Sequence, residues 1–363
     1  MTKENIVKSQ MTPRERVLAA INHQPVDRVP TDYWGTNEAT GKFMRELGCK
    51  TWEEFADKLN IDGLPGVWPK YIGPEVPKGK DMWGVEYETV HYSQNGNDGV
   101  YDEMVRHPIE HCTSIDEIEA CYTFPKADWF DYSNVRADCE KIKDHAIQGP
   151  YMSPWYMYAN IRGLEQSMCD MAAEPEIADY ILGKIVDFYI EHHSRTLEAA
   201  GGLIDICQVT EDFGSQKDLL ISLDMFDRYF RRHFGRMIKM CKDFNTKVFH
   251  HDDGSIMKIV PIMVELGIDI LNPIQWHLPG MDLDALKNNF GKKICFHGAI
   301  DNQDVLPFGT VADVREEVKT CIEKLACDGT GYILAPCHNM QVISPTENLV
   351  EMYRAAGEFG IIR

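Results

Sequence analysis

The sequence lacks the features that mark membrane-spanning and exported proteins. No apolar run among the 363 residues approaches the ~18 residues that a membrane-spanning helix needs. The first residues, Met1 to Asn5, have no apolar core of the kind found in signal peptides. The eleven cysteines form no Cys-x-x-Cys pair and are odd in number, which argues against a disulfide framework. These absences predict a cytoplasmic protein.

Basic residues are also scarce. The chain has 37 Lys and Arg against 57 Asp and Glu, a formal net charge of −20. Nucleic-acid backbones and anionic membranes both attract basic surfaces, so this balance argues against either as a partner. With 44% apolar and 26% charged residues, the composition is that of a globular chain. The partners we expect are therefore a small-molecule substrate and other proteins, and the sequence does not specify an oligomeric state.

The sequence pattern changes from irregular to regular near residue 145. Residues 1–145 are irregular and interrupted by Pro and Gly, with one clear helix start at Thr12 and Pro13 and a possible hairpin around 84–101. No flexible Gly/Ser linker separates this part from the rest. We therefore expect residues 1–363 to form a single domain, with 1–145 wrapped on its remainder.

Beyond residue 145, apolar strand-like runs alternate with helical stretches. The expected strands are 203–209, 247–250, 268–273, 293–297 and 332–335, preceded by possible strands at 29–34 and 146–150. The expected helices are 163–200 (interrupted or restarted at Pro175), 224–244, 255–266, 282–289, 310–325 and 345–359. With an eighth strand hidden in the irregular part, this alternation predicts an α/β fold, a (β/α)8 TIM-type barrel with an irregular N-terminal extension. An open doubly wound sheet is the alternative, although no GxGxxG follows the first strand.

Polar side chains follow five successive predicted strands. In a parallel barrel the carboxyl ends of the strands share one face, where active sites lie, so we expect these side chains to converge. Any one of these clusters alone would be only a polar strand end. The candidates are Glu211, Asp212, His251, Asp253, His297, Asp301, Cys337 and His338.

Three of these candidates suit a metal ion. His251, Asp253 and Cys337 offer imidazole, carboxylate and thiolate, and three protein ligands with an open fourth position are typical of catalytic zinc. Alternatively, Asp253 caps a helix and Cys337 packs in the barrel wall.

The other candidates have two possible roles each. Glu211 and Asp212 are predicted catalytic acids, or else groups that anchor a polar substrate. His338 and His297 either donate to a substrate oxygen or are structural histidines, and we assign His338 to catalysis. His297 and Asp301 are assigned to substrate binding.

The chain resembles the uroporphyrinogen decarboxylase superfamily, which includes the methylcobamide:coenzyme M methyltransferases. The resemblance runs through residues 13–17 (PRERV), 27–30 (DRVP), 211–216 (EDFGSQ), 331–339 (GYILAPCHN) and 344–348 (SPTEN). It implies a (β/α)8 barrel and adds Arg28 as a substrate-binding candidate.

Two features favour the methyltransferase branch. Decarboxylases of this family bind the carboxylates of their substrate with an early arginine-rich segment, whereas residues 31–38 here (TDYWGTNE) contain no arginine. The methyltransferases bind zinc through a His-x-Cys-Gly segment and a later Cys. The corresponding residues here are His251, Asp253 and Cys337, so a carboxylate replaces one thiolate.

The resemblance therefore implies a zinc-dependent methyl transfer between a corrinoid protein and a thiol or another small acceptor, such as a tetrahydrofolate-type compound. The chain has no Asp-x-His-x-x-Gly cobalamin signature, so any corrinoid would arrive on a partner protein. The alternatives are a decarboxylase acting on a tetrapyrrole or another carboxylated compound, and a binding protein without catalytic activity.

Overall fold

Six parallel strands form the centre of the fold. The computed structural model describes residues 11–94 and 97–362. The strands are hydrogen-bonded side by side in chain order, each parallel to the next. They are β5 (Gln148–Met152), β6 (Ile206–Val209), β7 (Lys247–His251), β8 (Ile270–Asn272), β9 (Cys295–Ile300) and β10 (Tyr332–Pro336).

Two irregular segments complete the ring of strands. Thr31 pairs in parallel with Leu334 of β10, and Gly66 pairs in parallel with Gln148 of β5. The two segments are joined to each other because the amide of Asp62 donates to the carbonyl oxygen of Thr31 at 3.0 Å. The predicted (β/α)8 barrel is therefore confirmed, and its hidden eighth strand is the short extended segment around residues 62–67.

Helices connect the strands as the alternation predicted. They are α6 (Pro154–Arg162), α7 (Leu164–Ala173), α8 (Pro175–Ala200), α9 (Leu223–Met225), a π-helical turn (Phe226–Phe230), α10 (Arg231–Asp243), α11 (Val260–Leu266), α12 (Leu283–Phe290), α13 (Val305–Phe308), α14 (Val311–Leu325) and α15 (Thr346–Phe359). Pro175 starts a second helix, as its missing N–H favours. The helix predicted from residue 255 begins only at Val260, because Pro261 sits in its first turn and residues 257–259 form a turn.

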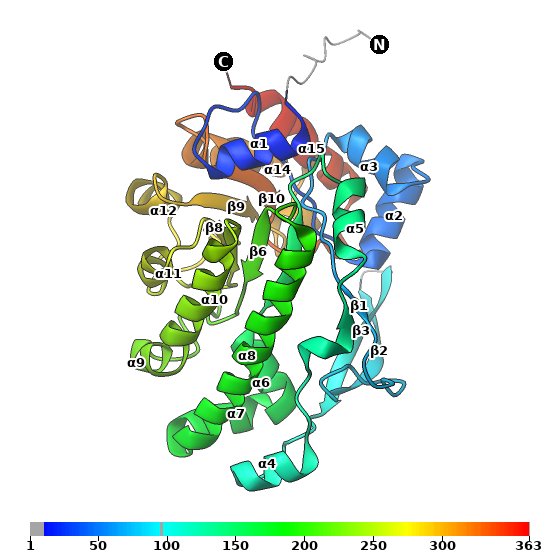
Figure 1. The fold of residues 1–363 in the computed structure, drawn as a ribbon. Helices are drawn as coiled ribbons and strands as arrows, with labels where there is room; N and C mark the ends of the chain where they lie inside the picture. Colours follow the sequence, from blue (N-terminus) through cyan, green and yellow to red (C-terminus); the bar gives the residue numbers. More distant parts are fainter. Residues whose placement is uncertain (1–10, 95–96, 363) are drawn as a thin grey trace.

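The N-terminal part contributes short elements around the barrel (Figure 1). They are α1 (Pro13–Ile21), α2 (Asn37–Leu47), α3 (Trp52–Leu59), β1 (Lys70–Tyr71), β2 (Glu86–Gln94), β3 (Asn97–Arg106), α4 (Ile115–Cys121), a 3-10 turn (Ala127–Trp129), β4 (Phe130–Asp131) and α5 (Val135–Lys141). Strands β2 and β3 form the expected antiparallel hairpin, and β1 pairs with β4. Among the described residues, no helix has both the length and the apolar character to cross a membrane.

Helix α1 covers the amino-terminal end of the barrel. Thr12 and Glu15 form a capping box that starts the helix where the sequence predicted it. The buried side chains of Val17 and Ile21 belong to one apolar cluster with Ile206 and Ile270, which lie on β6 and β8. In Figure 1 this helix lies at the top of the molecule. The opposite end, where the strands finish, is left for the loops that carry the candidate site.

A buried carboxylate ties α1 to the strand that closes the barrel. Asp62 forms ion pairs with Arg16 of α1 and with Arg28, whose Nη1 lies 2.8 Å from Asp62 Oδ2. The same carboxylate accepts the backbone N–H of Thr31 at 2.9 Å. Arg16 also donates to Asp27 at 2.6 Å. The buried charge of Asp62 thus balances two guanidinium groups and joins α1 to the segment around Thr31.

We expect Asp62→Asn to lower the free energy of unfolding by about 3–5 kcal/mol, because it removes the carboxylate that pairs with Arg28 and leaves Arg16 paired with Asp27. Asp57 lies on the exposed side of α3, and Asp57→Asn is the matched control. It should change the free energy of unfolding by less than about 0.5 kcal/mol. Urea unfolding followed by circular dichroism measures both.

We also propose that residues 11–145 unfold together with the barrel, in one transition, because Phe43, Phe55 and Trp83 share its apolar core. Two separate transitions would contradict the single-domain prediction.

Candidate metal centre

Four of the predicted side chains meet beyond the carboxyl ends of the strands. The Nε2 atom of His251 lies 3.6 Å from Asp212 Oδ1 and 3.9 Å from Asp253 Oδ1. His338 Nε2 lies 4.0 Å from Asp253 Oδ2. The metal-binding atoms that His251, Asp253 and His338 offer are all within 4.8 Å of one another. These three residues, which we call the metal triad, come from the ends of β7 and β10.

The backbone holds the loops after β6 and β7 against each other. Gly254 has a φ of 97°, and a Cβ atom there would lie 2.6 Å from the backbone of Gly214. The buried carboxyl of Asp252 accepts the amides of Phe213 and Gly214 at 2.8 and 3.2 Å. Burial raises the pKa of Asp252 well above its ordinary value. Asp252 therefore fixes the loop that carries Asp212 beside the metal triad.

The chemistry of Asp253 fits a bound cation. Its Oδ1 atom is buried and has no hydrogen-bond partner among the described residues. Burial raises the pKa of the Asp253 carboxyl, while the neighbouring His251 and His338 oppose that rise. A divalent ion would give this oxygen a partner and offset the cost of burying its charge. Two imidazoles and one carboxylate form a common catalytic zinc ligand set.

The structure brings His338, and not Cys337, to His251 and Asp253. The Cys337 thiol is buried and lies 3.5 Å from the carbonyl oxygen of Ile274. Burial raises the pKa of this thiol well above its ordinary value, which opposes the thiolate form that binds metals. The chain bends at residues 337 and 338, just after β10, and the thiol of Cys337 faces Ile274 whereas the imidazole of His338 faces Asp253. His338, predicted as a catalytic residue, takes the place predicted for Cys337.

The two predicted catalytic acids of the β6 loop have different surroundings. Glu211 is buried, and its carboxylate accepts the amides of Trp155 and Tyr156 at 2.5 and 3.0 Å, at the start of α6. Burial raises the pKa of Glu211 well above its ordinary value. The Asp212 side chain is 54% exposed and accepts the amide of Asp253 at 3.2 Å. Glu211 therefore positions α6, whereas Asp212 faces the metal triad; their catalytic roles stay predictions.

Two of the predicted substrate-binding residues use their polar atoms within the fold. Arg28 is paired with Asp62, as described above. The Asp301 carboxylate accepts the amides of Gln303, Asp304 and Val305 at 2.9–3.1 Å, at the turn into α13. Neither contact belongs to the metal triad. Substrate binding by these two residues stays a prediction.

The third predicted substrate-binding residue, His297, is fully buried beneath the metal triad. The sequence argument did not assign its neighbours Trp34 and Asn272 to the site. The Trp34 ring lies 5.5 Å from the ring of His251, 5.8 Å from His297 and 6.3 Å from His338. Asn272 ends β8, and its Oδ1 lies 2.6 Å from His251 Nδ1. Asn272 lies at the end of a strand, as the predicted site residues do. That position in the sequence could have identified it as a site residue.

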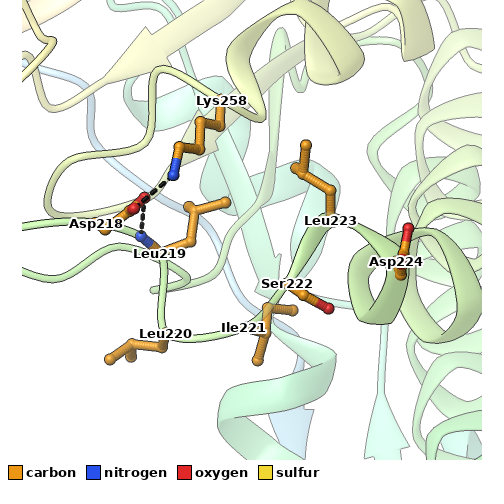
Figure 2. A pocket seen from close by; sticks show the side chains of 8 residues that line it. All are labelled: Asp218, Leu219, Leu220, Ile221, Ser222, Leu223, Asp224 and Lys258. Carbon is orange, nitrogen blue, oxygen red and sulfur yellow. Dashed lines mark hydrogen bonds and ion pairs between the residues drawn. The ribbon is translucent and has the colours of Figure 1, made fainter.

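Two surface hollows adjoin the same loops. One, of about 600 Å³, is lined by residues 218–224 and Lys258; Figure 2 shows the ion pair of Lys258 with Asp218 at its edge. The other, of about 420 Å³, lies between the β2–β3 hairpin and residues 341–343, next to Thr36. The Tyr92 hydroxyl joins its two sides by donating to Gln341 at 3.4 Å. The loop after β10 thus carries both His338 and one wall of the second hollow.

Comparison with known proteins gives the family and the fold that this chain shares. Residues 131–359 match the family model of uroporphyrinogen decarboxylase (URO-D). The methylcobamide:CoM methyltransferase MtbA of Methanosarcina acetivorans is 21% identical over 353 residues, which cover 97% of this chain and 99% of that protein. MtbA of Methanosarcina mazei matches to the same extent. A solved methyltransferase structure from Methanosarcina mazei has the same fold, with a TM-score of 0.65 and 17% identity over 96% of this chain and 99% of its own.

Glu211→Ala should lower the free energy of unfolding by about 1–3 kcal/mol, because the buried amides of Trp155 and Tyr156 lose their acceptor. Asp212→Ala, which removes the neighbouring exposed acid, should cost less than about 1 kcal/mol. Chemical denaturation compares the two variants. Equal losses would contradict the structural role of Glu211.

Proposed function

The chain belongs to the uroporphyrinogen decarboxylase family, and we propose that it is a zinc-dependent methyltransferase that works with a corrinoid protein and a small acceptor. The observation that carries the proposal is the metal triad, in which His251, Asp253 and His338 meet at the carboxyl end of the barrel. Nearly full-length similarity to two methylcobamide:CoM methyltransferases supports the same reaction class.

The charges and positions of the metal triad and of Asp212 suggest a role for each in methyl transfer. A bound zinc ion would act as a Lewis acid that favours the deprotonated form of a thiol or other acceptor. Two neutral imidazoles and one carboxylate leave a net charge of about +1 on such a centre, which suits an anionic acceptor atom. The exposed Asp212, whose Oδ1 lies 3.6 Å from His251 Nε2, is placed to take the proton that the acceptor loses.

The corrinoid would be supplied by a separate protein. The sequence has no Asp-x-His-x-x-Gly cobalamin signature. The decarboxylase alternative draws no support from the site, because it needs cations for the substrate carboxylates and Arg28 is already paired with Asp62. The family relation alone therefore does not select decarboxylation.

His338→Ala should abolish stoichiometric zinc binding, because it removes one of three ligands. Loss of a residue that only hydrogen-bonds to a metal ligand lowers metal affinity about 10–100-fold. The zinc affinity of His338→Ala should fall by more than that. Cys337→Ala is the matched control next to it and should keep wild-type zinc content. Elemental analysis after dialysis against zinc measures both. If Cys337→Ala loses the metal and His338→Ala keeps it, the ligand set predicted from the sequence replaces the metal triad.

The zinc-loaded protein should transfer the methyl group of free methylcobalamin to a small thiol under anaerobic conditions. The thiol loses its proton, its sulfur forms the new bond to the methyl carbon, and the cobalt–carbon bond breaks with its electron pair staying on cobalt as cob(I)alamin. The change in corrinoid absorbance follows the reaction, and the triad variant Asp253→Ala should be inactive. Activity of the zinc-free protein equal to that of the loaded protein would refute the proposal.

A further inference from the structure

A chain of hydrogen bonds leads from the metal triad into the barrel interior. His251 Nδ1 lies 2.6 Å from Asn272 Oδ1. Asn272 Nδ2 lies 2.8 Å from His297 Nδ1, and His297 Nε2 lies 3.1 Å from Asp32 Oδ2. Asn272 and His297 are fully buried, and Asp32 is 4% exposed. The four residues come from β7, β8, β9 and the closing segment around Thr31.

The carboxylate at the inner end sets the direction of the whole chain. An ionised Asp32 can only accept hydrogen bonds, and it also accepts the indole N–H of Trp34 at 3.0 Å. His297 must therefore donate from Nε2, which leaves Nδ1 of the neutral ring as an acceptor. Only the amide nitrogen of Asn272 can donate to that atom. The amide oxygen of Asn272 is then left to accept from His251.

A second contact fixes the orientation of the Asn272 amide independently. Its Nδ2 atom also lies 3.4 Å from the carbonyl oxygen of His297, where a reversed amide would place two oxygens together. Gly298 permits this approach: it has a φ of 101°, and a Cβ atom there would lie 3.3 Å from Asn272 Nδ2. Two acceptors thus hold the amide in one orientation.

We propose that Asp32, His297 and Asn272 are positioning residues that hold His251 with its proton on Nδ1. The Nε2 lone pair is then directed at Asp212 and Asp253, where the triad would bind metal. The inference rests on the proposed zinc site. It adds the buried Asp32, which is connected to the ligand His251 through His297 and Asn272. Metal-binding histidines commonly donate their other N–H to an oxygen that fixes the tautomer. Here a second histidine and an asparagine carry that constraint from a carboxylate to the ligand.

Paired variants of His297 test the direction of the chain. In His297→Leu the chain is broken, and zinc affinity should fall about 10–100-fold. In His297→Gln the side chain again offers one acceptor and one donor, so affinity should stay within about threefold of wild type. His277→Leu is the control, because His277 pairs with Glu317 outside the chain. Competition with a chromophoric chelator measures zinc affinity for all four proteins. Equal affinities of the Leu and Gln variants would overturn the inference.

A spectroscopic measurement on the zinc-free protein separates this inference from the proposed function. Nitrogen NMR of histidine-labelled protein distinguishes the two neutral tautomers, and the signals of His251 are those absent from His251→Gln. Wild type should show His251 protonated on Nδ1, and Asn272→Leu should show a mixture. A wild-type His251 protonated on Nε2 would overturn the inference, even if His297→Leu does not fold. Failure of wild type to bind zinc would instead refute the proposed function and leave the tautomer result standing.

Discussion

The arrangement of the site depends on the closure of the barrel by a segment with almost no strand structure. Thr31 pairs with Leu334 on one side and accepts the amide of Asp62 on the other. Asp62 secures this segment by accepting the amide of Thr31 and by pairing with the buried Arg16 and the partly buried Arg28. Asp32 and Trp34 follow directly, and they contact the histidines beneath the metal triad. A loss of this closure would therefore remove the inner wall of the site together with a strand.

The acidic residues near the carboxyl end of the barrel divide into two groups. Both carboxylate oxygens of Glu211 and Asp301, and one oxygen of Asp252, accept backbone amides at helix starts and loops. Asp212 and Asp253 lie nearer the surface and face imidazoles. A buried carboxylate needs donors to offset its desolvation, so the contacts of the first group hold the loops in place. The second group lies where a cation or a proton could reach its oxygens.

The sequence was a good guide to the regular part of the structure and a weaker one to side-chain direction. The strand–helix alternation predicted β6 to β10 and the helices α12, α14 and α15, because apolar runs and caps are local signals. The short helix α13 was not predicted. The extended segment around residues 62–67 has no such run, since it is joined to its neighbours by one β-bridge to Gln148 and by the hydrogen bond of the Asp62 amide to Thr31. The choice between Cys337 and His338 depended on which side each residue faces after β10, and spacing does not contain that information. Asn272 and Asp32 act through contacts between distant segments, which only the fold reveals.

Helix α1 and the end of the chain lie at the same pole of the barrel, opposite the metal triad. Ile361 pairs with Arg28 just before the closing strand, and α1 covers the strand starts (Figure 1). An affinity tag, a fluorophore or a solid support attached beside α1 or after α15 therefore faces away from the metal triad. Immobilised protein would keep the metal triad open to solution, where the corrinoid protein of the proposed reaction could reach it. Single-molecule and surface-based binding measurements can thus be built on either end of the described chain.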